Sequence, residues 1–249
     1  TATSAEDIDY DGEDEYLLYN DRLFTIFEVT GGRLVAAFVR EPLSGQVLQV
    51  AGNLVSYSGS SNEYEGAYSV NTNKSSRMEA YRTSCFKDWW AKESEGGGGT
   101  TGYVNEEYIF VDLTNGWRIT SSDDAIRKTV TLDNKSWELH ATYEMLGAKD
   151  ILYVRNGFSP NLWDLLLHGQ NTLGAQTISG GVIGVANTNY YVTVRSYVRY
   201  GSPYTAGINT NATDDDPSQG VSFYTVNMRN QAQTHQVELV GSNTFSFAL

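Results

Sequence analysis

Hydrophobic and polar residues alternate with a period of two along most of this chain. In the clearest stretch, residues 137–145, one face carries Trp137, Leu139, Ala141, Tyr143 and Met145, and the other carries Glu138, His140, Thr142 and Glu144. This alternation predicts a half-buried strand, because successive side chains of a strand point to opposite faces. Ile126, Lys128, Val130 and Leu132 alternate in the same way just before it, so the intervening Asp133-Asn134 predicts a hairpin turn.

The same pattern predicts strands through the rest of the chain. At the N-terminus, residues 16–19, 23–29 and 34–39 form a predicted meander, with turns at Asn20-Asp21 and Thr30-Gly31-Gly32. Further predicted strands cover 108–113, 117–120, 151–154, 182–186, 190–200, 221–228, 236–240 and 245–247. About a dozen strands without long intervening helices indicate antiparallel sheets. We therefore expect an all-β chain that forms one large antiparallel β-sandwich over residues 1–249.

Two short helices are expected to interrupt the strands. Residues 159–169 combine a capping Ser159, Pro160 at the first helical position and Gly169 just past the end. Residues 84–92 place Cys85, Phe86, Trp89 and Trp90 at helical spacing before a run of four glycines.

Composition and charge narrow the possible partners. The 249 residues are 40% hydrophobic and carry a formal net charge of -13, which suits a folded domain and repels nucleic acid phosphates and anionic membranes. No apolar run is long enough for membrane insertion. Cys85 is the single cysteine, so an intrachain disulfide is excluded and a bound metal ion would be an alternative source of rigidity.

An acidic segment near the N-terminus has the spacing of a calcium loop. Within residues 7–15 it offers the carboxylates of Asp7, Asp9, Asp11, Glu13 and Glu15, with Gly12 at the sixth position. Calcium takes six to eight oxygen ligands at about 2.3 to 2.6 Å, and such a tight loop can supply them. Leu18 stands where an EF-hand has its bidentate glutamate, so an EF-hand is excluded. The alternative is a solvated acidic arm without a metal.

Residues 16–35 also resemble a known family. Their Asn-containing turn, alternating strand, Gly31-Gly32-Arg33 turn and second strand are similar to the opening of the galactose-mutarotase-like supersandwich. That fold occurs in accessory domains of α-glucan-active glycoside hydrolases, including the C-terminal β domains of family 57 enzymes; residues 153–160 are a weaker second match. The resemblance implies a supersandwich, secretion and contact with carbohydrate. It brings no catalytic residues, because the carboxylate and histidines of mutarotases match no motif here.

Tryptophan is the residue type best suited to contact a sugar, since its flat apolar face stacks on the CH groups of a pyranose. Trp137 lies on an apolar strand face and Trp163 in a leucine-rich helix, so both are expected in the core. The remaining candidates for carbohydrate binding are Trp89, Trp90 and Trp117. Core packing is the alternative for at least one of the adjacent pair.

The leading hypothesis is an extracellular, calcium-stabilised accessory domain that binds carbohydrate, such as an α-glucan, without catalysis. No catalytic residue is assigned, because His140, His168 and His235 are far apart and form no metal or nucleophile motif. A self-associating structural subunit of a surface layer or filament is the first alternative, since exposed aromatic residues also serve subunit contacts. A carbohydrate-active enzyme with two carboxylates at hydrolase separation is the second.

Overall fold

The computed structural model describes residues 1–8, 10, 12–51, 84–91, 103, 106–146, 151–158, 177–179, 182–186, 195–199, 205–208, 233–240 and 244–249. All 17 elements in these ranges are β-strands, and every pair of neighbouring strands is antiparallel, which confirms the all-β prediction. No helix in the described ranges is long and apolar enough to cross a membrane.

The N-terminal strands form a five-stranded meander in sequence order. Its members are β1 (Ala2–Glu6), β2 (Glu15–Tyr19), β3 (Leu23–Glu28), β4 (Arg33–Arg40) and β5 (Val47–Ala51). The predicted strands at 16–19, 23–29 and 34–39 are confirmed within it, and β1 adds an edge strand that the alternation did not predict. β1 pairs with β2 from Ala2 opposite Tyr19 to Glu6 opposite Glu15.

A second sheet of eight strands contains the predicted hairpin. In spatial order its strands are β12 (Thr177–Ser179), β13 (Val182–Ala186), β14 (Arg195–Arg199), β17 (Thr244–Ala248), β10 (Leu139–Met145), β9 (Ile126–Leu132), β8 (Gly116–Ser121) and β7 (Tyr108–Asp112). The β9–β10 register runs without a break from Leu132 opposite Leu139 to Ile126 opposite Met145. The C-terminal strand β17 pairs along the other edge of β10.

A third sheet of four strands completes the described fold. Its order is β15 (Thr205–Ile208), β16 (Gln233–Val240), β11 (Ile151–Phe158) and β6 (Lys87–Ala91). Just before β6, Cys85 exchanges two backbone hydrogen bonds with Leu34 of β4, which ties this sheet to the first.

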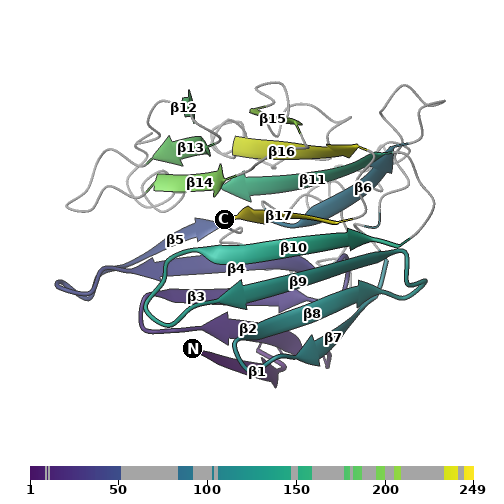
Figure 1. Cartoon of the computed structure of the whole chain (residues 1–249). Coiled ribbons are helices and arrows are strands. Elements are labelled where there is room, and N and C mark those ends of the chain that lie inside the picture. Colours follow the sequence, from purple (N-terminus) through teal and green to yellow (C-terminus); the bar gives the residue numbers. More distant parts are fainter. Residues whose placement is uncertain are drawn as a thin grey trace, which may run out of the picture.

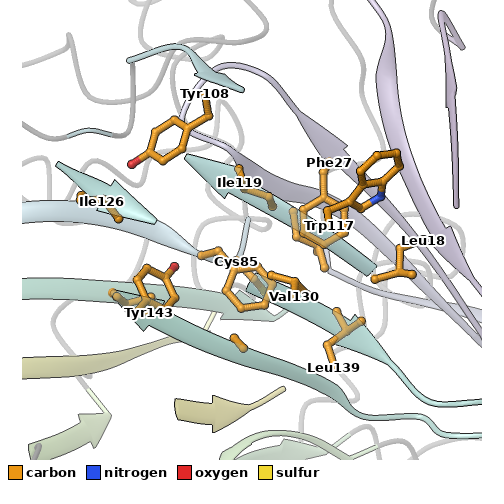
Figure 2. Packing of buried hydrophobic residues seen from close by; sticks show 14 of the residues in the cluster. Leu18, Phe27, Cys85, Tyr108, Trp117, Ile119, Ile126, Val130, Leu139 and Tyr143 are labelled. Atoms are coloured by element: carbon orange, nitrogen blue, oxygen red, sulfur yellow. The ribbon is translucent and has the colours of Figure 1, made fainter. Parts of the chain in front are cut away.

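The core lies between the first sheet and strands β7 to β10 of the second, which face each other as two layers (Figure 1). The sequence encodes this face directly: along β9 every second residue is buried, from Ile126 to Leu132. Aromatic and aliphatic side chains of both layers interdigitate in one cluster (Figure 2), which includes Leu18, Phe27, Leu34, Trp117, Ile119, Val130, Leu139 and Tyr143. Burial of this apolar surface is the main force that holds the layers together.

The predicted helix over residues 84–92 is wrong. Its central residues form strand β6, which pairs with β11 from Lys87 opposite Arg155 to Ala91 opposite Ile151. A short apolar run fits both helical and strand spacing, and here its partner strand β11, about 60 residues later, decides the outcome. The second predicted helix, 159–169, and the predicted strand 221–228 lie outside the described residues.

Candidate functional site

The acidic N-terminal segment folds back between strands β1 and β2. Glu15 opens β2 and is buried, and its Oε2 accepts a hydrogen bond from the backbone N–H of Ile8 at 2.6 Å. Asp7 accepts a second one through Oδ2 from the N–H of Gly12 at 3.2 Å. Each of these two carboxylates thus binds a backbone N–H group of the same segment, that of Ile8 or Gly12.

Two described residues of this segment have a left-handed backbone conformation. Gly12 has φ = 99° and Tyr10 has φ = 64°, both in the left-handed region. Oδ1 of Asp7 is buried and accepts no hydrogen bond from the described residues, so it is an oxygen suited to a cation.

Calcium binding itself stays a prediction. Asp9 and Asp11 lie outside the described residues, and Glu13 is exposed. Within the part of the chain that the structure describes, no three His, Cys, Asp or Glu side chains gather closely enough to hold a metal ion.

A second feature joins two hairpin turns, one from each layer of the sandwich. The side chain of Asn20, in the β2–β3 turn, donates hydrogen bonds to the carbonyl oxygens of Asp133 and Ser136 in the β9–β10 turn, both at 2.9 Å. Its Oδ1 accepts from the N–H groups of Arg22 at 2.8 Å and Leu23 at 2.9 Å. One amide thus uses both donor hydrogens and both acceptor positions to hold the two turns side by side.

The joined turns present a tryptophan at the surface. The guanidinium carbon of Arg22 lies 4.0 Å from the ring centroid of Trp137, a cation–π contact between the two turns. Trp137 is nevertheless 47% exposed. We refer to this feature as the Arg22–Trp137 platform.

The expectation that Trp137 is buried in a strand is therefore wrong. Strand β10 begins only at Leu139, because Oγ of Ser136 accepts a hydrogen bond from the N–H of Glu138 at 2.9 Å and extends the turn. The alternating pattern could not show this displacement, although a serine two residues before Glu138 was its local signal.

Trp117 lies in the core instead of on the surface. It is 5% exposed, and its indole N–H donates to the carbonyl oxygen of Leu17 at 3.0 Å, across the two layers. Tyr16 and Phe110 pack against its ring edge to face, with centroids at 5.2 and 5.9 Å. This burial disfavours Trp117 as a contact for carbohydrate.

Trp89 and Trp90 occupy adjacent positions of strand β6, opposite Tyr153 and Leu152 of β11. The structure does not describe their side chains, so their role in carbohydrate binding stays a prediction. The structure brings neither of them to the Arg22–Trp137 platform by strand pairing: β6 belongs to the third sheet, and the platform to turns of the other two.

A third feature is a cluster of polar side chains that is buried in the core. Nζ of Lys128, on β9, is 2.7 Å from Oδ2 of Asp88, on β6, and both side chains are 0% exposed. The amine also donates to the carbonyl oxygens of Gly31 and Phe86, each at 2.9 Å. The alternation placed the charged Lys128 on the apolar face of its strand. Its ion pair and hydrogen bonds within this cluster offset the cost of burying the amine there.

Two tyrosine hydroxyls complete this cluster. Tyr108 donates to Oδ2 of Asp88 at 3.0 Å, and Tyr143 donates to Oδ1 at 2.9 Å. Both tyrosines belong to the core cluster drawn in Figure 2. Nζ of Lys128 lies 4.6 Å from the ring centroid of Tyr108 and 5.8 Å from that of Tyr143, so aromatic faces shield the pair from water.

Burial shifts the pKa of each group toward its uncharged form. It raises the pKa of the Asp88 carboxyl, against the opposing attraction of Lys128 and the tyrosine hydrogen bonds. It lowers the pKa of the Lys128 amine, against the attraction of Asp88. Burial, with a further contribution from Asp88, raises the pKa of Tyr108 and Tyr143 well above the ordinary value, so both remain hydrogen-bond donors.

Comparisons with known proteins support the fold but no family. No protein-family model matches the sequence, and no curated protein is detectably similar to it. Among solved structures, 4-α-glucanotransferase from Thermococcus litoralis is similar with a TM-score of 0.51 and 11% identity, over 99% of this chain and 40% of that enzyme. The crystal structure of HI1317 matches with a TM-score of 0.49 and 8% identity, over 100% of this chain and 98% of that chain.

At 11% identity the first similarity concerns the fold alone. The chain spans 40% of the length of the glucanotransferase, so that enzyme's activity does not carry over to it. The likeness agrees at this coarse level with the resemblance noted in residues 16–35.

Proposed function

We propose that this chain is a non-catalytic accessory domain that binds carbohydrate, with the Arg22–Trp137 platform as its contact surface. The observation that carries the proposal is the 47% exposure of Trp137 beside a guanidinium fixed 4.0 Å from its ring centroid. A sugar ring needs an apolar surface for its CH groups and nearby hydrogen-bonding groups for its hydroxyls. The platform offers the first through the indole and the second through the guanidinium.

The rigidity of the platform supports this role. Asn20 fixes both turns through four hydrogen bonds, so the orientation of Arg22 and Trp137 is largely set before any ligand arrives. A preorganised surface loses little conformational entropy on binding. Exposed polar residues of the same two turns, Asp21, Asp133 and Lys135, add hydrogen-bonding groups around it.

We propose an α-glucan as the carbohydrate. The support is the shared fold of a 4-α-glucanotransferase, together with the resemblance of residues 16–35 to accessory domains of α-glucan-active hydrolases. An extracellular location is part of the same proposal, since it follows from that resemblance.

Titration calorimetry with soluble maltooligosaccharides, preceded by a glycan array, tests the proposal. Replacing Trp137 with Ala should weaken α-glucan binding at least about tenfold, equivalent to ~1.4 kcal/mol. The matched control is Leu146→Ala, which removes an apolar side chain that is 48% exposed and follows the opposite end of strand β10, and it should leave the affinity unchanged. Absence of binding by the unaltered chain to any glycan would reject the carbohydrate proposal, and particles that grow with protein concentration would favour the structural-subunit alternative.

We also propose that a calcium ion stabilises the segment 7–15. Asp7, Glu13 and Glu15, with Asp9 and Asp11, would supply its oxygen ligands. Oδ1 of Asp7, which is buried and accepts no hydrogen bond from the described residues, fits such a ligand.

Thermal melts in EDTA and in millimolar calcium test the calcium proposal. We expect calcium to raise the melting temperature of the unaltered chain, because an ion bound only by the folded state adds its binding free energy to stability. Asp9→Asn and Asp11→Asn should each remove most of that increase, whereas Asp21→Asn, an exposed carboxylate outside the segment, should retain it. A melt that is identical in EDTA and calcium would reject the ion.

A further inference from the structure

The buried pair of Asp88 and Lys128 holds an amine in contact with a carboxyl group. Nζ of Lys128 lies 2.7 Å from Oδ2 of Asp88, and neither side chain is accessible to solvent. The residues are 40 positions apart and belong to different sheets, so the contact exists only in the folded chain.

We propose that Asp88 and Lys128 condense to an intramolecular amide, an isopeptide bond that links β6 of the third sheet to β9 of the second. With Cys85 as its single cysteine, the chain has no intrachain disulfide, and this amide would provide a covalent cross-link by a different chemistry. The bond would close a loop of 40 residues and so restrict the unfolded chain, as a disulfide does.

The reaction needs an uncharged amine and a protonated carboxyl, and burial favours that pair. A proton passes from Nζ of Lys128 to Oδ2 of Asp88 along their 2.7 Å hydrogen bond. Burial supports this transfer, since it raises the pKa of the carboxyl and lowers that of the amine. The carbonyl oxygens of Gly31 and Phe86 accept the remaining N–H hydrogens and keep the amine beside the carboxyl.

The lone pair of Nζ then attacks Cγ of Asp88 and forms the C–N bond. Negative charge develops on Oδ1, where the hydroxyl of Tyr143 donates a hydrogen bond at 2.9 Å, and Tyr108 donates to the departing Oδ2. The nitrogen gives one proton to Oδ2, the C–O bond breaks, and one water molecule leaves. The step consumes no oxidant, reductant or other reactant, and holding the two groups in contact replaces the activation that a bimolecular condensation would require.

The intact mass of the purified full chain, measured after denaturation, tests the proposal directly. We expect a mass lower than that of the sequence by one water molecule. A proteolytic digest should contain one branched peptide that joins the segment around Asp88 to the segment around Lys128, and trypsin should not cleave after Lys128. A folded sample with the full sequence mass and no branched peptide would overturn the proposal.

Two single substitutions test whether the bond joins Lys128 to Asp88. Lys128→Arg keeps a cation but should retain its full mass, because a guanidinium does not condense with a carboxyl. Asp88→Asn should form the same amide by losing ammonia, and so reach the same final mass as the cross-linked unaltered chain. If either variant fails to fold, the mass and the digest of the unaltered chain still show whether the amide is present.

A surface pair in the same sheet provides the matched control. Arg127 contacts Glu144 at 3.0 Å, but each side chain is 34% exposed, so solvent reaches this pair. Arg127→Lys would place an amine on the strand opposite this solvent-accessible carboxylate, and we expect no loss of water at this position. A second loss of water there would overturn the claim that burial in the Asp88 and Lys128 cluster drives the condensation.

Discussion

The side-chain amide of Asn20 donates a 2.9 Å hydrogen bond to the carbonyl oxygen of Asp133, 113 residues later and in the opposite layer of the sandwich. Three further hydrogen bonds, to Ser136, Arg22 and Leu23, use the rest of its capacity. The exposed Arg22–Trp137 platform therefore depends on one polar side chain that joins the two turns.

Replacing Asn20 with Ala should destabilise the fold and loosen the platform. The partly buried carbonyl and N–H groups that it serves lose their partners, at an expected cost of about 1 to 3 kcal/mol in the free energy of unfolding. Urea unfolding measures the cost, and binding of maltooligosaccharides to the folded variant should weaken as well. Asn134→Ala, an exposed residue of the same turn, should change neither by more than ~0.5 kcal/mol. Equal effects of the two substitutions would contradict the role of Asn20.

Substitution with Phe should destabilise the fold far more at Trp117 than at Trp137. At Trp117 the change removes a buried N–H donor to Leu17 and leaves unfilled volume in the core, which should reduce the free energy of unfolding by about 2 to 4 kcal/mol. At Trp137 the ring is half exposed, and we expect a loss below ~0.5 kcal/mol. Chemical denaturation of both variants provides the comparison, and a stable Trp117→Phe protein would show that the indole is not a core element.

The alternation of residues was sufficient to predict most of the described strands. In β9 and β10 each inward-facing residue is apolar, except Lys128, which forms a buried ion pair with Asp88. The period of two therefore identified both strands and their hairpin. Strand β6 could not be identified in this way, because its five residues also fit a helix and the distant strand β11 decides between them. Local pattern is informative where one face is buried and the strand is long.

The candidate surface was harder to predict than the fold. Trp137 becomes exposed because the turn extends to Glu138 through Ser136, a displacement of two residues that reverses the expected burial. Lys128 was visible as a charge on an apolar face, but its partner Asp88 lies in a segment whose predicted helix was wrong. Such contacts between distant segments arise from tertiary packing, which a single sequence does not report.

Gly116 should tolerate no larger side chain. A Cβ at this position would lie 2.1 Å from the carbonyl oxygen of Val130 on the neighbouring strand β9, and the backbone would have to shift. We expect Gly116→Ala to lower the free energy of unfolding by at least about 2 kcal/mol. Gly45→Ala is the control: its Cβ would meet only Arg40 at 3.8 Å, so its cost arises from φ = 71° and should be nearer 1 kcal/mol, of the order expected for a left-handed residue. Thermal melts of both variants compare these losses of stability. A smaller loss for Gly116→Ala than for Gly45→Ala would contradict the close packing of Gly116 against β9.

The turn between β4 and β5 should open in acid through one exposed carboxylate. Glu41 accepts hydrogen bonds from the backbone N–H groups of Leu43, at 3.0 Å, and Ser44. These bonds lower the pKa of Glu41 below its ordinary value, because they favour the charged form.

Since the folded pKa of Glu41 is depressed, its contribution to the turn is present above the unfolded pKa and is lost as the pH falls through the folded pKa. A nuclear magnetic resonance titration of its side-chain carboxyl carbon should therefore give a midpoint below that of Glu41 in a short unfolded peptide. The amide signals of Leu43 and Ser44 should shift with the same midpoint, and in Glu41→Gln they should lose that pH dependence. A midpoint equal to that of the peptide would mean that the two backbone hydrogen bonds do not persist in solution.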